Sequence, residues 1–474
     1  MKKQLSYIAN VPLLNCAAPV LNAPYAITHR EERGTTMAQL KAGFAWTSQR
    51  NHRLGHIALV ILLLASTTLI GQAQTLTTLH NFTGGADGGM PWAGLTIDRG
   101  GNLYGTTFQG GNGFGTVYKL AQKNGNWTIA PLYKFNGGND GANPVAPVIL
   151  GPNGTLYGTT VGGGGTSNTC NSPYPVGCGI VFNLAPRPSI PPSPLTPWNE
   201  TVLYRFQGTT DGAYPGYGDL TFDSAGNIYG TTSQAGVSSA QCFPLGCGVV
   251  FKLTHSGQGY TESVIYSFTG GTDGSWPVGA VVFNSTGEAY TTAGSLNPSG
   301  ANGGGTVIEL TPSGGGWTET TIHNFTPGTD GSSPWSGVIL DSSGNLYGTT
   351  STNGSGGGGT VFELMPSGGG GVYNVLQSFS GSGNSPGPLR RLVMDSAGNL
   401  YGTTFADGAH GLGSVFKLTH SGGGWTYTSL HDFTGGSDGA NPYSTVVFDS
   451  SGNLYGTASA GGSMGQGVVW EITP

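Results

Sequence analysis

The chain has 474 residues, of which 87 are glycine and only 8% are charged. From residue 74 onward it holds 10 basic and 21 acidic residues, a net charge of −11. Nucleic acids and anionic membrane surfaces need a basic protein face, so this charge argues against both as partners. The glycines recur at fixed places between runs rich in Val, Leu, Tyr, Thr and Phe, a pattern typical of strands joined by tight turns.

The segment before the first repeat resembles an export signal. Residues 53–73 combine a basic flank, an apolar run and a small-residue end, with cleavage expected after Ala73. The apolar run is shorter than the roughly 18 residues of a membrane span, which makes a membrane anchor the weaker alternative. We expect residues 1–36 to be a non-native leader or misassigned start, because Met37 can begin the protein. Residues 37–73 are then the signal peptide and 74–474 the folded domain. This predicts a secreted or periplasmic protein without membrane insertion after signal removal.

One short segment returns seven times along the rest of the chain. Asn-Leu-Tyr-Gly-Thr-Thr at 102–107 recurs, with small changes, at 155–160, 227–232, 288–293, 345–350, 399–404 and 453–458. Around it, each repeat carries four strand-like runs: run a (PWAGLTID in the first repeat), run b (NLYGTT), run c (GTVYKL) and run d (WTETTIHNF in a later repeat). Seven units of four antiparallel strands predict an all-β fold, a seven-bladed β-propeller with four-stranded blades.

The two ends of this region fit each other. Residues 75–82 form a run d with no a, b or c before it, and residues 467–474 form a run c with no d after it. We therefore predict that the N-terminal strand 75–82 completes the last blade, which closes the ring and hides a sheet edge. A solenoid would need capping repeats, and the sequence contains none. We expect a monomer.

The NLYGTT and GTVFKL-type segments resemble those of the GloVer tandem-repeat family, secreted bacterial proteins also described as "choice-of-anchor" proteins. The resemblance covers residues 75–474. It implies an exported repeat protein and carries no established activity, substrate or catalytic residues.

Four cysteines occupy equivalent loops of two consecutive repeats. Cys170 and Cys178 share one loop, and Cys242 and Cys247 share the next. Each pair is close enough to form its own disulfide in an oxidising compartment. Metal ligation is the weaker alternative, because no histidine lies beside them.

An aspartate recurs between run d and the next run a in six of the seven repeats. These residues are Asp87, Asp140, Asp211, Asp273, Asp330 and Asp438. A ring of carboxylates could bind Ca²⁺. A functional group is usually needed only once in a protein, so the repetition favours the alternative that each aspartate caps its own turn. We predict no cofactor and keep Ca²⁺ as the weaker alternative. His80, His323 and His431 occupy equivalent run d positions and are interpreted as repeat residues.

Three charged residues interrupt a series of small residues where the innermost strands should converge. They are Asp219 in the third repeat and Arg390 and Arg391 in the sixth. Charges are costly at such a crowded place unless they are paired or hydrated, so they are candidates for a channel site. The alternative is an arginine that packs between blades. Next to them in the alignment stand Trp92, Tyr217, Trp335 and Tyr443, whose rings suit sugars but equally suit packing between blades.

Catalytic motifs are absent from the sequence: there is no Gly-x-Ser-x-Gly and no His-Glu-x-x-His. We therefore expect an extracytoplasmic binding or interaction module for glycans or cell-surface partners. One alternative is a carbohydrate-active enzyme, a glycosidase or lyase with a channel-centred site that uses Asp219, Arg390 and Arg391. The other is a structural envelope protein.

Overall fold

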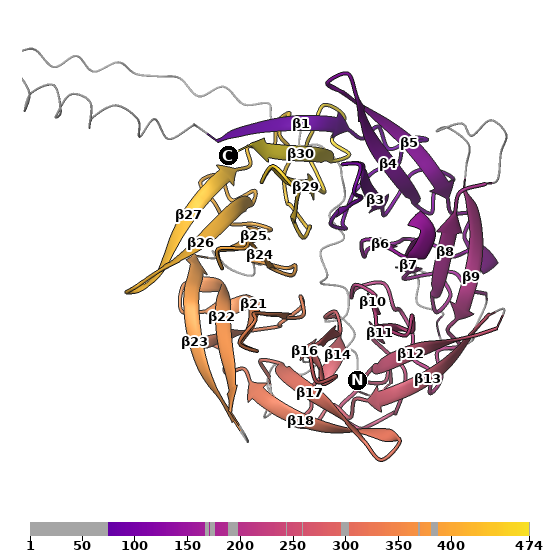
Figure 1. The fold of residues 1–474 in the computed structure, drawn as a ribbon, viewed down its shortest axis with the longest axis vertical. Coiled ribbons are helices and arrows are strands. Elements are labelled where there is room, and N and C mark those ends of the chain that lie inside the picture. The colour runs from indigo at the N-terminus through magenta and orange to yellow at the C-terminus, as the bar shows by residue number, and fades with distance from the viewer. Residues whose placement is uncertain are drawn as a thin grey trace, which may run out of the picture. The chain divides into compact units, whose positions relative to one another are not determined.

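The computed structural model describes residues 74–165, 170, 176–187, 198–242, 244–257, 259–294, 303–367, 370–380 and 387–473. These residues form seven small antiparallel sheets in a ring, which confirms the all-β class and the seven-bladed propeller (Figure 1). The predicted leader (1–36) and signal peptide (37–73) lie outside the described residues. Within the part of the chain that the structure describes, no helix is long and apolar enough to cross a membrane.

Each blade is one sheet, and in blades 1 to 6 the strands follow the chain from the channel outwards, whereas the outermost strand of blade 7 is β1. Blade 1 comprises β2 (Thr96–Ile97), β3 (Leu103–Thr107), β4 (Thr116–Lys123) and β5 (Asn126–Lys134). Blade 2 comprises β6 (Ile149–Leu150), β7 (Leu156–Thr160), β8 (Ile180–Ala185) and β9 (Asn199–Arg205). Blade 3 comprises β10 (Thr221–Phe222), β11 (Ile228–Thr232), β12 (Val249–Ser256) and β13 (Gly259–Ser267). Two single-turn 3-10 segments, η1 (Gly138–Asp140) and η2 (Pro152–Gly154), flank β6.

Blades 4 and 5 each carry one extra inner strand beside the usual four. Blade 4 comprises β14 (Ser275–Pro277), β15 (Val282–Phe283), β16 (Ala289–Gly294), β17 (Thr306–Ser313) and β18 (Gly316–Asn324). Blade 5 comprises β19 (Asp330–Ser332), β20 (Ile339–Leu340), β21 (Leu346–Gly354), β22 (Gly357–Ser367) and β23 (Gly370–Ser380). Blades 6 and 7 comprise β24 (Val393–Met394), β25 (Leu400–Thr404), β26 (Ser414–Ser421) and β27 (Gly424–Asp432); β28 (Val447–Phe448), β29 (Leu454–Ala458), β30 (Val468–Thr473) and β1 (Thr75–Asn81).

The innermost strand is shorter than the sequence predicts. In blade 1 the apolar run ends in only two residues, Thr96 and Ile97, that pair with β3. The carbonyls before them bond instead to the neighbouring blade, because the inner runs of adjacent blades lie very close together. Thr457 Oγ1 of blade 7, for example, donates to the carbonyl of Ala93 at 2.8 Å. Thr106 makes the same contact by donating to the carbonyl of Ala146. The first threonine of the NLYGTT segment therefore bonds one blade to the next.

A glycine and an aromatic ring face each other inside almost every blade. A Cβ on Gly105 of β3 would lie 2.4 Å from the hydroxyl of Tyr118 on β4, so a side chain there would displace the ring. The same close approach joins Gly402 to Phe416 in blade 6. In blade 4 both positions change together, to Thr291 and Ile308, because a smaller side chain on β17 leaves room for one on β16. This exchange shows that the two residues act as one packing unit.

A phenylalanine at or directly after the end of each outermost strand joins one blade to the next. Phe135 after β5 packs edge-on against Phe182 in blade 2, with ring centroids 5.2 Å apart. Phe82 after β1 makes the same contact with Tyr118 in blade 1, at 5.1 Å. Both phenylalanines are fully buried. The core of the propeller is therefore a set of apolar interfaces between blades, each built from residues that every repeat supplies.

The N-terminal strand closes the ring as the sequence predicts. β1 pairs antiparallel with β30, with Thr75 opposite Thr473 and Thr78 opposite Trp470 (Figure 1). β1 thus occupies the outer position in blade 7 and covers the edge that β30 would otherwise expose.

Two sets of loops share one face of the ring, which we call the loop face. They are the loops that enter each blade and the loops between its second and third strands. Short antiparallel bridges join them within a blade, as between Gly89 and Gln109 or between Ala440 and Ala460. The described parts of the middle loops therefore lie on the loop face, around one mouth of the channel.

Candidate functional site

The channel is narrow because the innermost runs of the blades nearly touch. A Cβ on Gly94 of blade 1 would lie 2.7 Å from the carbonyl oxygen of Thr445 in blade 7. Gly279 and Gly337 of blades 4 and 5 are in similar contact. Small residues are needed here for steric reasons, so a long charged side chain can be placed only inside the channel itself.

Arg390 crosses the channel and binds backbone groups of three other blades. Its Nη1 donates to the carbonyl of Tyr217 at 2.9 Å, and its Nη2 donates to the carbonyls of Val145 and Trp92 at 2.9 and 3.2 Å. Its Cζ lies 4.3 Å from the ring centroid of Tyr443 in blade 7. The residue is 7% exposed. Arg390 of blade 6 therefore connects blades 1, 2, 3 and 7, and does not pack between two adjacent blades.

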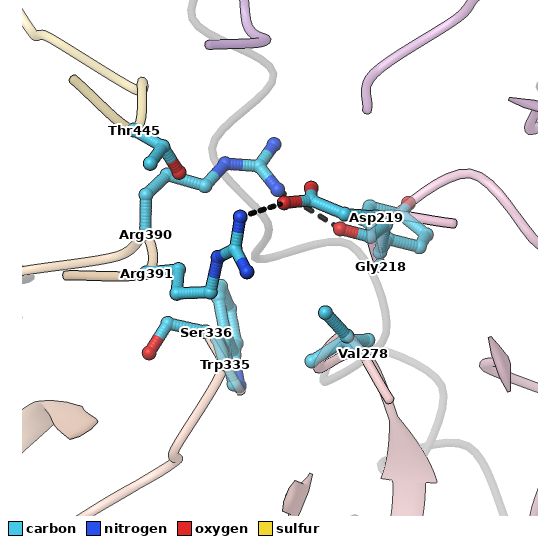
Figure 2. A pocket seen from close by; sticks show the side chains of 10 residues that line it. Gly218, Asp219, Val278, Trp335, Ser336, Arg390, Arg391 and Thr445 are labelled. Carbon is cyan, nitrogen blue, oxygen red and sulfur yellow. Dashed lines mark hydrogen bonds and ion pairs between the residues drawn. The ribbon is translucent and has the colours of Figure 1, made fainter. Parts of the chain in front are cut away.

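Arg391 lies beside Arg390 and forms an ion pair across the channel. Its Nη2 lies 3.3 Å from Oδ2 of Asp219 in blade 3 (Figure 2). The two side chains are 33% and 14% exposed, so the pair can be reached from solvent on the arginine side. The structure thus brings together all three charged residues that the sequence singled out. The carboxylate of Asp219 is paired with Arg391. It therefore differs from an unpaired carboxyl group that acts as the acid or base of a hydrolase.

The space beside these charges is small. Its lining includes Val278, Trp335 and Thr445 in addition to the three charged residues (Figure 2). The volume in which the centre of a water-sized molecule fits is ≈ 10 Å³. That is about the minimum for one water molecule, in a space that is open to solvent beside Arg391.

The four aromatic residues predicted at the channel mouth are half-buried, and three of them, Trp92, Trp335 and Tyr443, make ring contacts. Trp92 stacks on Phe108 with centroids 4.2 Å apart and touches Tyr443 at 6.0 Å. Trp335 touches Trp276 at 6.2 Å, on blades 5 and 4. Tyr217 lines the central space beside Asp219, and burial raises the pKa of its hydroxyl. The rings thus form two groups on different sides of the ring of blades.

Both predicted disulfides are present. Cys170 is bonded to Cys178 and Cys242 to Cys247, and all four residues are buried. These bonds exclude the alternative of metal ligation by the cysteines. They fix the middle loops of blades 2 and 3, which lie on the loop face.

The repeated aspartates cap turns. Asp87 accepts hydrogen bonds from the backbone N–H and the hydroxyl of Thr83, and Asp273 is bonded in the same way by Thr269. Among the described residues no group of three His, Cys, Asp or Glu side chains could hold a metal ion. The repeat histidines belong to the same turns, since His80 Nε2 lies 3.0 Å from Asp87 Oδ2.

In three of these turns a tyrosine occupies the position of the histidine. A glutamate from the next blade lies beside each of these three turns. Tyr204 donates to Asp211 at 3.1 Å, and Glu262 of blade 3 lies close by. Burial, and then the charge of Asp211, raise the pKa of Glu262 to about 7. Glu200 stands in the same relation to Asp140, and burial raises its pKa to about 7 as well.

The raised pKa values predict a pH-dependent stability near neutrality. The folded chain holds the Glu262 proton more tightly than the unfolded chain, so this contribution is complete below about pH 4.5 and is lost as the pH rises through about 7. We expect Glu262→Gln to raise the free energy of unfolding at pH 8 by about 1 kcal/mol, because the half-buried carboxyl is partly screened by solvent. Urea unfolding at pH 8 and pH 4.5 measures this, and an equal change at both values would contradict it.

Two features of the site were not predicted from the sequence. The partners of Arg390 are backbone carbonyls of Trp92, Val145 and Tyr217, and a carbonyl does not depend on residue type. The Tyr–Asp–Glu groups combine residues of two consecutive repeats, whose runs d touch only in the folded ring. In each group the glutamate lies six residues before the phenylalanine of its own repeat, and the tyrosine belongs to the preceding repeat. A comparison of these two sequence positions across the repeats would have revealed the groups.

The sequence profile of the Gloeobacter/Verrucomicrobia repeat family matches residues 66–189 and 291–474, which is more than half of the chain. The chain belongs to the Gloeobacter/Verrucomicrobia repeat family. No curated protein matches it. The family assignment agrees with the resemblance drawn from the NLYGTT segments.

Several solved structures are similar to this family member. An ulvan lyase solved with bound -[GlcA(1-4)Rha3S]- is 13% identical, with 81% of this chain and 94% of that chain covered and a TM-score of 0.49. The polysaccharide lyase Uly1 is 10% identical, with 83% and 91% covered and a TM-score of 0.45. A gluconolactonase of Xanthomonas campestris is 10% identical, with 84% and 89% covered and a TM-score of 0.40. At such low similarity these structures say nothing about the activity of this chain.

Proposed function

We propose that the protein is an extracytoplasmic binding module whose ligand, a glycan or a cell-surface partner, docks on the loop face. The observation that carries this proposal is the filled channel. Arg390 is bound to three carbonyls, Asp219 is paired with Arg391, and the remaining space holds about one water. The small space beside these groups favours a glycan or protein ligand that binds outside the channel.

The loop face has the side chains that such a ligand needs. The two aromatic groups, Trp92 with Tyr443 and Trp276 with Trp335, are half-buried around the channel mouth. Aromatic surface next to hydroxyl and amide groups can bind sugars, which present apolar C–H faces and hydroxyls together. Farther out, Val176, Val237 and Met464 are 57%, 47% and 63% exposed on the middle loops of blades 2, 3 and 7. Single exposed apolar residues of this kind are common on protein surfaces, so they do not discriminate between a glycan and a protein partner.

The extracytoplasmic location rests on the signal-like segment 37–73 and on the two disulfides. If the protein is exported, thiol labelling of native material should modify none of the four loop cysteines. After denaturation and reduction, mass measurement should find all four labelled. Labelling of these cysteines before reduction would argue against export to an oxidising compartment.

A glycan array and a pull-down from cell-surface extracts test the ligand class. We expect Trp92→Ala and Trp335→Ala to weaken glycan binding about tenfold or more, because each removes a ring from the loop face. Trp127→Ala is the matched control, since Trp127 lies at the hairpin between β4 and β5, on the opposite face. Binding to neither glycans nor surface proteins would refute the proposal. Turnover of a polysaccharide that is lost in Asp219→Asn would replace it with the channel-centred enzyme.

A further inference from the structure

Among the described residues, the channel contains one positive charge more than its acidic residues can pair. Arg390, Arg391 and Asp219 are the charged residues that line its central space. Asp219 is paired with Arg391, and Arg390 makes no ion pair among the residues that the structure describes. Carbonyl oxygens and the Tyr443 ring partly stabilise the Arg390 guanidinium. A buried cation without a counter-ion is nevertheless costly, so this arrangement favours a bound anion.

Hydrogen-bond donors are available for such an anion. The Nε–H groups of Arg390 and Arg391 are both buried and donate to no acceptor within the described part of the chain. Arg390 is more than nine-tenths buried, so water cannot fully solvate its Nε–H. The single contact of Arg391 with Asp219 is 3.3 Å long and uses one Nη, which leaves the rest of that guanidinium for a second partner. Charge-assisted bonds to an anion are the strongest partners that such donors can find.

The size of the space restricts the anion. A volume of ≈ 10 Å³ holds about one water molecule, and a halide ion is close to water in size. A carboxylate could reach the same donors end-on from the side where Arg391 is 33% exposed. A sugar ring is larger than this space, so we treat the anion site as distinct from the ligand surface proposed for the loop face, although Trp335 borders the space as well.

We infer that the channel binds one small monovalent anion, chloride or a carboxylate, between the guanidinium groups of Arg390 and Arg391. Asp219 competes with this anion for Arg391. Removing the Asp219 charge therefore strengthens anion binding, whereas removing the Arg391 charge weakens it. A purely structural ion pair between Asp219 and Arg391 would not produce these opposite effects.

The test measures ³⁵Cl⁻ NMR line width and thermal stability of the purified protein while chloride replaces isethionate at constant ionic strength. The expected result is saturable line broadening with one site per chain, and a melting temperature that rises with chloride. Asp219→Asn should bind chloride about tenfold more tightly, and Arg391→Gln should lose the saturable broadening. Acetate is the second probe: competition with chloride extends the site to carboxylates, and its absence restricts the site to halides.

Two controls separate binding from misfolding. Circular dichroism checks that Arg391→Gln is folded, and Asp219→Asn gives an independent reading because it predicts a gain. Equal broadening by the wild type and Arg391→Gln, or no tightening in Asp219→Asn, would overturn the inference. A negative glycan array would leave it untouched, since the anion binds in the channel and the glycan on the loop face.

Discussion

Replacing Arg390 by alanine is expected to lower the free energy of unfolding by about 3–5 kcal/mol. The substitution leaves the carbonyls of Tyr217, Val145 and Trp92 without their donor and removes the cation from the Tyr443 ring. Because these four partners belong to four blades, the loss weakens the ring as a whole. Urea unfolding followed by tryptophan fluorescence measures the change.

Arg205→Ala is the matched control for this prediction. Arg205 also donates to a backbone carbonyl, that of Asn139, but it is exposed at the rim. Its removal should change stability by no more than about 0.5 kcal/mol. Arg390→Lys should fall between the two, because an ammonium keeps the charge but lacks the planar fork that reaches carbonyls on both sides. Similar losses in Arg390→Ala and Arg205→Ala would show that the channel contacts of Arg390 contribute little.

Replacing Phe82 by alanine should also cost about 3–5 kcal/mol, although the residue lies near the start of the folded chain. Phe82 is fully buried and packs edge-on against Tyr118 of blade 1, 5.1 Å away. It fills the same place between blades 7 and 1 that other phenylalanines fill between consecutive blades. Removing it opens a cavity at the one interface where the two ends of the chain meet. Equilibrium unfolding in urea gives the magnitude.

Phe206→Ala provides the comparison inside the ring. Phe206 is 2% exposed and packs against Phe251 with the same geometry and centroid distance, 5.1 Å. If β1 is an integral part of blade 7, the two substitutions should destabilise the protein by similar amounts. A silent Phe82→Ala beside a strongly destabilising Phe206→Ala would mean that the N-terminal strand is not packed in the ring.

The blade architecture could be predicted from the sequence because each interface uses side chains that every repeat supplies. The glycine of run b, the aromatic residue of run c and the phenylalanine after run d form one packing unit, as Gly105, Tyr118 and Phe82 do. The departure in blade 4, Thr291 with Ile308, keeps that unit filled. Repetition also revealed the missing strand of blade 7, since a run d without partners at one end matched a run c at the other.

The channel could be predicted only in part. Arg390, Arg391 and Asp219 stood out because they replace small residues, and the structure places all three in the channel. Their pairing could not be predicted, because Asp219 and Arg391 belong to blades 3 and 6 and meet only across the closed ring. The extent of the innermost strands was overestimated for a related reason: their carbonyls bond to threonines of the neighbouring blade, as Ala93 does to Thr457.

The fold depends most on the closure of the ring by β1, and a cross-link between β1 and β30 tests this closure most directly. Thr75 and Thr473 are exposed cross-strand partners, so cysteines at both positions should form a disulfide within one chain under mild oxidation. Leu76→Cys with Thr473→Cys is the control, because a shift by one residue turns the side chain to the other face of the sheet. Mass measurement and non-reducing electrophoresis should find a cross-linked monomer for the first pair and free thiols for the second. No bond between positions 75 and 473, or a bond between two chains, would contradict a ring closed by its own N-terminal strand.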